Sequence, residues 1–217
     1  MKKNSTELVF ILDKSGSMRG LEKDTIGGYN SMLEQQRKID GECVITTVLF
    51  DNCCELLHDR IDIRAIGPIS EREYFVGGST ALLDAIGKAI HKIGTAQKNT
   101  AEDYRAEKVM FVIITDGEEN ASRQYSFAQV KKMIQRQKER YGWEFIFLGA
   151  NMDAVETAGR FGIDADRAVD YVPDSEGTEL NFRMMSETAA AFRKCGAVPA
   201  ACLDKIRKDR KKRGGRR

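Results

Sequence analysis

Residues 8 to 17 read Leu8-Val9-Phe10-Ile11-Leu12-Asp13-Lys14-Ser15-Gly16-Ser17, an unbroken apolar run that ends in a carboxylate and two hydroxyls on alternate residues. Such a run, bounded by a turn, is typical of a strand buried on both faces of a parallel sheet. A turn at Gly16 places the side chains of Asp13, Ser15 and Ser17 on one side, because glycine lets the backbone bend there. Oxygen ligands of this kind suit a hard cation such as Mg²⁺ or Mn²⁺ rather than zinc or copper. The stretch therefore predicts one buried strand and half of a cation site.

The other half of this site is expected on neighbouring loops, and two stretches fit. Gly77-Gly78-Ser79-Thr80 presents a hydroxyl just before the helical pattern of residues 81–93. Thr115-Asp116-Gly117 follows a second apolar run, residues 109–114. In open α/β sheets, ligands bind outside the carboxyl ends of the strands, at the switch point between neighbouring strands. One metal ion bridging these three loops is the most economical interpretation.

The three motifs, in this order, resemble a von Willebrand factor A domain over about residues 5–190. The matched positions are those of the family's metal-ion-dependent adhesion site: Asp13, Ser15, Ser17, Thr80 and Asp116. The resemblance implies that Ser15, Ser17 and Thr80 touch Mg²⁺ or Mn²⁺, while the two carboxylates act mainly through bound waters. It also implies recognition, not catalysis, in which an Asp or Glu of a partner protein completes the metal shell. The chain is similar in this respect to stand-alone intracellular bacterial members of the family.

Each motif taken alone has a simpler explanation. Ser and Asp are favoured helix N-caps, and Thr80 alone is better explained as a cap of the next helix. Asp-Gly after a strand is common in plain turns. The three motifs together favour the metal site over these alternatives. Three further acids near the predicted site are expected on the solvated surface, since the family pattern does not need them: Asp84, Glu118 and Glu119.

Strand patterns alternate with helix patterns along the chain. The expected strands are residues 7–12, 44–50, 53–58, 109–114, 143–148 and 168–172, and the expected helices are residues 20–39, 81–93, 126–141, 152–161 and a last one from 175 or 178 to 194. The strand at 53–58 is short and follows a tight turn, which predicts an antiparallel hairpin partner at the sheet edge. The alternation predicts right-handed crossovers, and therefore a doubly wound, mostly parallel Rossmann-like α/β sheet flanked by helices.

Length and composition fit one large domain of an ordinary soluble protein, with 217 residues of which 41% are hydrophobic. No stretch approaches the roughly 18–20 apolar residues that span a membrane. The N-terminal apolar run is too soon interrupted by Asp13 for a signal peptide, so we expect a cytoplasmic protein with no membrane partner. An odd number of cysteines, five, with only two histidines argues against a zinc site and a disulfide framework.

Charge is distributed unevenly between the body and the C-terminus. Residues 205–217 contain nine Lys or Arg and one acid, a net charge of +8, so the remaining residues carry −6 of the total of +2. We therefore expect a von Willebrand A-like domain over residues 1–195 and a basic, flexible tail over residues 196–217. Such a tail can attract nucleic acid or an acidic partner. Nucleic-acid binding is the weaker alternative, because no aromatic residue follows Phe192 to stack on bases.

A metal-dependent phosphoryl-transfer enzyme is the remaining alternative. An Asp ending the first strand is also found in enzymes of the haloacid dehalogenase kind, but their chemistry needs a second carboxylate two residues later, where this chain has Ser15. No Gly-x-x-x-x-Gly-Lys phosphate loop is present, and neither histidine, His58 or His91, has a nucleophile near it in sequence. We therefore expect that the chain is not an enzyme.

Overall fold

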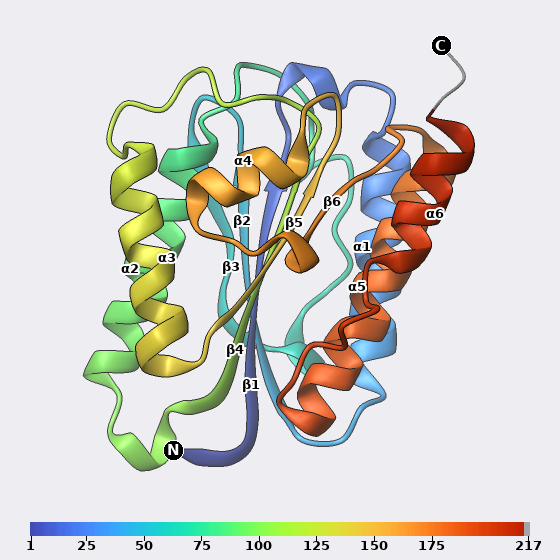
Figure 1. Ribbon diagram of the computed structural model, residues 1–217. Coiled ribbons are helices and arrows are strands. Elements are labelled where there is room, and N and C mark those ends of the chain that lie inside the picture. The colour runs from blue at the N-terminus through green and yellow to red at the C-terminus, as the bar shows by residue number, and fades with distance from the viewer. Residues whose placement is uncertain (215–217) are drawn as a thin grey trace.

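The centre of the computed structural model, which describes residues 1–214, is a six-stranded sheet in the order β3-β2-β1-β4-β5-β6 (Figure 1). All neighbouring strands are parallel except β2 and β3. The strands are β1 (Lys2–Asp13), β2 (Glu42–Phe50), β3 (Cys54–Asp62), β4 (Ala106–Thr115), β5 (Glu144–Gly149) and β6 (Ala168–Asp170). The predicted doubly wound, mostly parallel sheet with an antiparallel edge strand is therefore confirmed.

Helices cover both faces of this sheet. One layer contains α1, α5 and α6, and the other contains α2, α3 and α4 (Figure 1). The helices are α1 (Glu22–Arg37), α2 (Leu82–Asn99), α3 (Phe127–Tyr141), α4 (Ala154–Phe161), α5 (Ser175–Cys195) and α6 (Asp204–Arg213). Short 3-10 turns are η1 (Gly16–Met18), η2 (Ile63–Ala65), η3 (Glu102–Tyr104) and η4 (Ala165–Arg167). Each parallel strand thus has a helical layer on both sides, as a doubly wound sheet requires.

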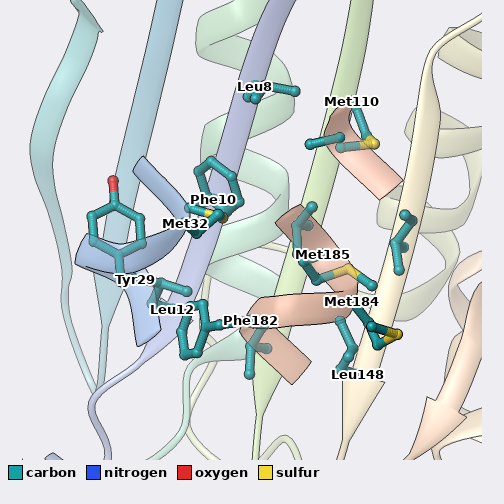
Figure 2. Packing of buried hydrophobic residues seen from close by; sticks show 14 of the residues in the cluster. Leu8, Phe10, Leu12, Tyr29, Met32, Met110, Leu148, Phe182, Met184 and Met185 are labelled. Atoms are coloured by element: carbon teal, nitrogen blue, oxygen red, sulfur yellow. The ribbon is translucent and has the colours of Figure 1, made fainter. Parts of the chain in front are cut away.

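The apolar run of β1 supplies both halves of the core. Leu8, Phe10 and Leu12 point toward α1 and α5 (Figure 2), whereas Val9 and Ile11 belong to the cluster on the opposite face. All five side chains are at most 1% exposed. Successive side chains of a strand point to opposite faces, so a strand with helices on both sides needs apolar residues at every position. This is why the run is unbroken.

β3 and α2 extend well beyond their predicted C-terminal ends. β3 continues to Asp62 rather than ending near residue 58, because its pairing with β2 shifts register around His58 and then resumes. The edge strand is therefore not short, as was predicted. α2 continues to Asn99, through residues 94–99, which carry no proline to stop it.

The C-terminal segment differs from the predicted flexible tail. Residues 204–213 form α6, which packs against α5 and β6. Val198, Leu203 and Ile206 are buried and join the core on the α1–α5 face. Arg213 pairs with Asp174, the residue that caps the start of α5, at 2.6 Å. The structured part therefore extends well past residue 195, and the last three residues of the predicted tail, 215–217, lie outside the described residues.

None of the helices within residues 1–214 has the length and apolar character that crossing a bilayer requires. The cytoplasmic location stays a prediction.

Candidate metal centre

The predicted site residues lie at the end of the sheet where β1 and β4 finish, at the top of Figure 1. β1 and β4 are neighbours in the middle of the sheet, and the helices that follow them, α1 and α3, cover opposite faces. The order of strands reverses at this point, and such switch points are where open α/β sheets bind ligands. Asp13 is the last residue of β1, and Asp116 follows the last residue of β4.

Three hydroxyl groups come together here from two loops. The Oγ of Ser15 lies 3.1 Å from the Oγ of Ser17, and the hydroxyl of Thr80 donates to the Oγ of Ser15 at 3.0 Å. The loops are joined directly, because the N–H of Gly16 donates to the carbonyl of Gly78 at 3.0 Å. Ser15 and Thr80 are buried and Ser17 is exposed, so the cluster reaches from the interior to the surface.

Asp13 is buried beside these hydroxyls, and both of its oxygens are in use. Its Oδ1 accepts from the backbone N–H of Ser15 at 2.7 Å, and its Oδ2 accepts from the hydroxyl of Thr115 at 2.5 Å. Burial raises the pKa of Asp13 to about 6; the hydrogen bonds from Thr115 and Ser15 oppose this rise, and the charge of Asp116 adds to it. The charged form of Asp13 is therefore costly in the protein alone, and a nearby cation would favour it.

Asp116 has an oxygen that nothing in the chain satisfies. The residue is 2% exposed, and its buried Oδ1 has no hydrogen-bond partner among the described residues. Burial raises the pKa of Asp116, and a hydrogen bond with Ser17 opposes that rise. Buried polar atoms in proteins nearly always have a partner, including ordered water or an ion. The Oδ1 of Asp116 is therefore available to a water molecule or an ion from outside the chain.

Gly117 leaves room for such a ligand. A Cβ atom added at Gly117 would lie 3.0 Å from both the Oγ of Ser17 and the Oγ1 of Thr80, and 3.9 Å from the Oγ of Ser15. The three hydroxyls therefore face one small space that any larger residue would partly fill. The surrounding donors are all oxygens, the set that Mg²⁺ and Mn²⁺ prefer. The residues present fit a hard divalent cation.

Similarity to solved structures shows the fold. The chain matches a von Willebrand factor type A protein from Catenulispora acidiphila with a TM-score of 0.59 and 17% identity, covering 86% of this chain and 43% of that one. It matches the manganese-loaded TRAP protein of Plasmodium vivax with a TM-score of 0.52 and 18% identity, covering 75% and 62%. The fold is von Willebrand factor A-like.

A third match is proximal thread matrix protein 1 from the mussel byssus with a zinc-occupied MIDAS motif, at a TM-score of 0.57 and 12% identity, covering 86% of this chain and 46% of that one. The chain spans less than two thirds of the length of each of these three proteins. Two of them hold manganese or zinc, which supports divalent metal binding by von Willebrand A-like folds in general. No protein-family model and no curated protein sequence matches the chain.

The structure brings the five predicted residues to the same end of this von Willebrand A-like sheet. The hydroxyls of Ser15, Ser17 and Thr80 contact one another, Asp13 accepts from the backbone of Ser15, and Asp116 interacts with Ser17. Their role as metal ligands stays a prediction.

Two acids that were expected on the solvated surface instead build the loops around the site. Asp84 is 6% exposed and accepts hydrogen bonds from the backbone N–H groups of residues 123–125 at 2.9–3.1 Å. Glu119 accepts from the backbone of Leu83 at 2.8 Å, and Asn120 accepts from the backbone of Thr80 at 2.9 Å. The loop after β4 is thereby tied to the start of α2, which fixes Thr80. The one sequence signal for this role is that Asp84 stands among apolar helix residues.

Proposed function

We propose that this chain is a divalent-metal-dependent protein interaction module. The observation that carries the proposal is the orphan Oδ1 of Asp116, buried next to three hydroxyls that face the space above Gly117. A structural capping role for these residues leaves that oxygen without a partner, whereas a hydrated cation would supply a bound water to it and balance its charge. The von Willebrand A-like fold supports the proposal, because the matched structures with manganese and zinc share it.

Ser15, Ser17 and Thr80 would hold the ion, which we propose is Mg²⁺ or Mn²⁺, and Asp13 and Asp116 would balance its charge mainly through water. When bound, the ion would supply a positive centre that can accept one further oxygen ligand. The carboxylate of a partner's Asp or Glu is the proposed ligand, since hydroxyls carry no negative charge and a carboxylate gains more than water there, especially where the interface excludes solvent.

We propose recognition rather than catalysis at this site. His58 lies on β3, where its Nδ1 is 3.0 Å from the hydroxyl of Thr47, and His91 lies on α2, lining a cavity with Trp143 just before β5. Neither imidazole is among the groups that contact the hydroxyl cluster. Lys14 lies between Asp13 and Ser15 in the sequence, but its ammonium pairs with Glu55 at 2.8 Å. It is therefore not among the groups that contact the three hydroxyls. Among the described residues, the hydroxyl cluster therefore has ligands for a cation but neither an imidazole nor a lysine beside it.

Calorimetry and thermal unfolding with Mg²⁺ or Mn²⁺ test this function. A metal at about 100 times its Kd should stabilise the protein by about 2.7 kcal/mol through ligand linkage. Thr80→Val, which removes one hydroxyl at nearly constant volume, should strongly reduce both the binding heat and the stabilisation. The absence of any binding heat or stabilisation in the wild-type protein would reject the metal site.

Thr178→Val is the matched control for this experiment. The hydroxyl of Thr178 is buried in α5 without a hydrogen-bond partner in the described residues, so its loss removes no interaction. The control should keep the full metal response. An equal loss of response in both variants would show that the effect of Thr80→Val is a general consequence of Thr replacement.

A further inference from the structure

Phe75 is exposed although it lies in a well-packed loop. Its side chain is 58% exposed, and it is the one phenylalanine among the exposed large apolar residues of the described chain. Its neighbours on both sides point inward: Tyr74 is 1% exposed, and Val76 packs against the core. A fold that buries Tyr74 and partly buries Val76 while leaving a phenylalanine in solvent forgoes the favourable burial of a large apolar side chain.

The loop that carries Phe75 is fixed to the metal centre. The hydroxyl of Tyr74 donates to the carbonyl of Asp13, and the N–H of Gly77 donates to the carbonyl of Lys14 at 2.9 Å. A third hydrogen bond joins the next residue of the loop to the same turn: the N–H of Gly16 donates to the carbonyl of Gly78. Phe75 is therefore held between attachment points to the same turn that supplies Ser15 and Ser17. It is pre-positioned rather than mobile.

Lys14 fixes the ring itself. Its ammonium lies 4.4 Å from the centroid of the Phe75 ring and 2.8 Å from a carboxylate oxygen of Glu55. The Lys14 side chain is only 6% exposed, so its charge is covered by the ring and matched by Glu55. A cation over one face of an aromatic ring stabilises that arrangement. Lys14 thus positions the ring and is not itself presented to a partner.

We propose that Phe75 is the apolar contact of the partner-binding surface beside the metal, and that it recognises an apolar side chain close in sequence to the partner's Asp or Glu. The inference rests on the proposed function, because the carboxylate must first reach the metal. Aromatic residues, phenylalanine among them, are enriched in the cores of protein interfaces, and a ring already held in place loses little conformational freedom on binding. The partner segment is therefore acidic and apolar together, not acidic alone.

Synthetic hexapeptides test this inference without a known partner. One peptide has a single Asp in a glycine background, and four others add one Leu at one or two positions before or after the Asp. Binding to the full chain is measured by NMR titration in millimolar Mg²⁺ and again in excess EDTA. At least one Leu peptide should bind about tenfold more tightly than the glycine peptide in Mg²⁺, as burying a leucine against an aromatic ring implies.

Phe75→Ala should remove this preference for leucine while leaving the glycine peptide and the Mg²⁺-induced stabilisation unchanged. Phe75→Leu should keep part of the preference, because it keeps an apolar surface. Tyr104→Ala is the control, since Tyr104 is an exposed aromatic residue, 71% exposed, in the η3 turn before β4, at the other end of the sheet. It should bind all five peptides as the wild type does.

The outcomes separate this inference from the proposed function. If the glycine peptide binds in Mg²⁺ and not in EDTA but no leucine improves binding, the role of Phe75 is rejected and the metal-dependent module stands. A leucine preference that survives in Phe75→Ala also rejects it. If no peptide binds to the wild type in Mg²⁺ although the metal itself binds, carboxylate recognition and the role of Phe75 are both rejected.

Discussion

Two clusters of buried polar side chains differ in whether the chain itself satisfies them. Between α1 and α5, Arg193 is 2% exposed and donates to the carbonyls of Gln36, Ile39 and Gly41 at 2.5–3.2 Å. At the opposite end of β1, the Oδ1 of Asp116 has no donor in residues 1–214. In the first cluster, the chain supplies every partner of the Arg193 hydrogen bonds, which join α5 to the end of α1. The second is incomplete without an added ion, so only the second should respond to metal.

The largest effect is expected at the complete cluster. Arg193→Ala removes the guanidinium donors from three carbonyls in and just after the end of α1 and opens a cavity, so it should lower the free energy of unfolding by about 4 kcal/mol. Urea denaturation measures this loss, which should be the same with and without Mg²⁺. Arg183→Ala is the control, because Arg183 is 53% exposed and should change stability by less than about 0.5 kcal/mol.

The next largest effect concerns α6, which joins the same helical layer as Arg193. Ile206 is 1% exposed in the core cluster, so Ile206→Ala should cost about 3 kcal/mol. Lys208→Ala, at an exposed position of the same helix, should cost almost nothing. If Ile206→Ala and the wild type are equally stable in urea, α6 does not pack against α5 and β6. That result would instead agree with the flexible tail expected from the sequence.

The sheet could be predicted because its signals are local. Runs such as residues 8–12 and 109–114 are apolar at every position, which only a strand covered on both faces needs. The same reasoning placed Asp13 and Asp116 together, because the carboxyl ends of neighbouring parallel strands meet at one edge. The parts of the candidate site that follow strand ends were therefore accessible from the sequence.

The predictions that were wrong concern contacts between segments that are distant in the sequence. The charge of residues 205–217 predicted a solvated tail, but Cys202 and Leu203, just before α6, and Ile206 within it are buried in the core. Asp174 supplies the pair for Arg213 from 39 residues away. Asp84 likewise accepts from backbone groups of a loop about 40 residues later. No local pattern shows which backbone N–H groups a folded loop will present to a carboxylate.

The free energy of unfolding, measured as a function of pH, should show the effect of the buried carboxylates at the candidate metal centre. The folded pKa of Asp13 is about 6, above its ordinary value of 3.8, so its protonated form stabilises the fold. That contribution is fully present below about pH 4 and is lost as the pH rises through about 6, a loss on the order of 3 kcal/mol in metal-free protein. Added Mg²⁺ favours the charged form, so its stabilising effect should grow over the same interval.

Asp13→Asn tests the assignment of this titration. The amide keeps an oxygen for the N–H of Ser15 and cannot ionise, so the metal-free variant should lose the part of the pH dependence between about 4 and 6 that Asp13 contributes. It should also lose most of the response to Mg²⁺. A metal-free wild type whose stability is level over this interval would contradict the burial of a titrating Asp13.

The smallest effect on stability is expected from Gly117→Ala, although its effect on metal binding should be large. The new methyl group would lie 3.0 Å from the hydroxyl oxygens of Ser17 and Thr80, a tight contact that a rotation of either hydroxyl-bearing side chain relieves. The metal-free variant should therefore lose less than about 1 kcal/mol. The methyl group nevertheless occupies the space that the three hydroxyls face, so calorimetry should detect little or no binding of Mg²⁺.

Gly67→Ala is the control, because a Cβ atom there meets nothing within 4 Å. Undiminished binding by Gly117→Ala would place the ion elsewhere, and it would leave the orphan oxygen of Asp116 to be satisfied by water alone.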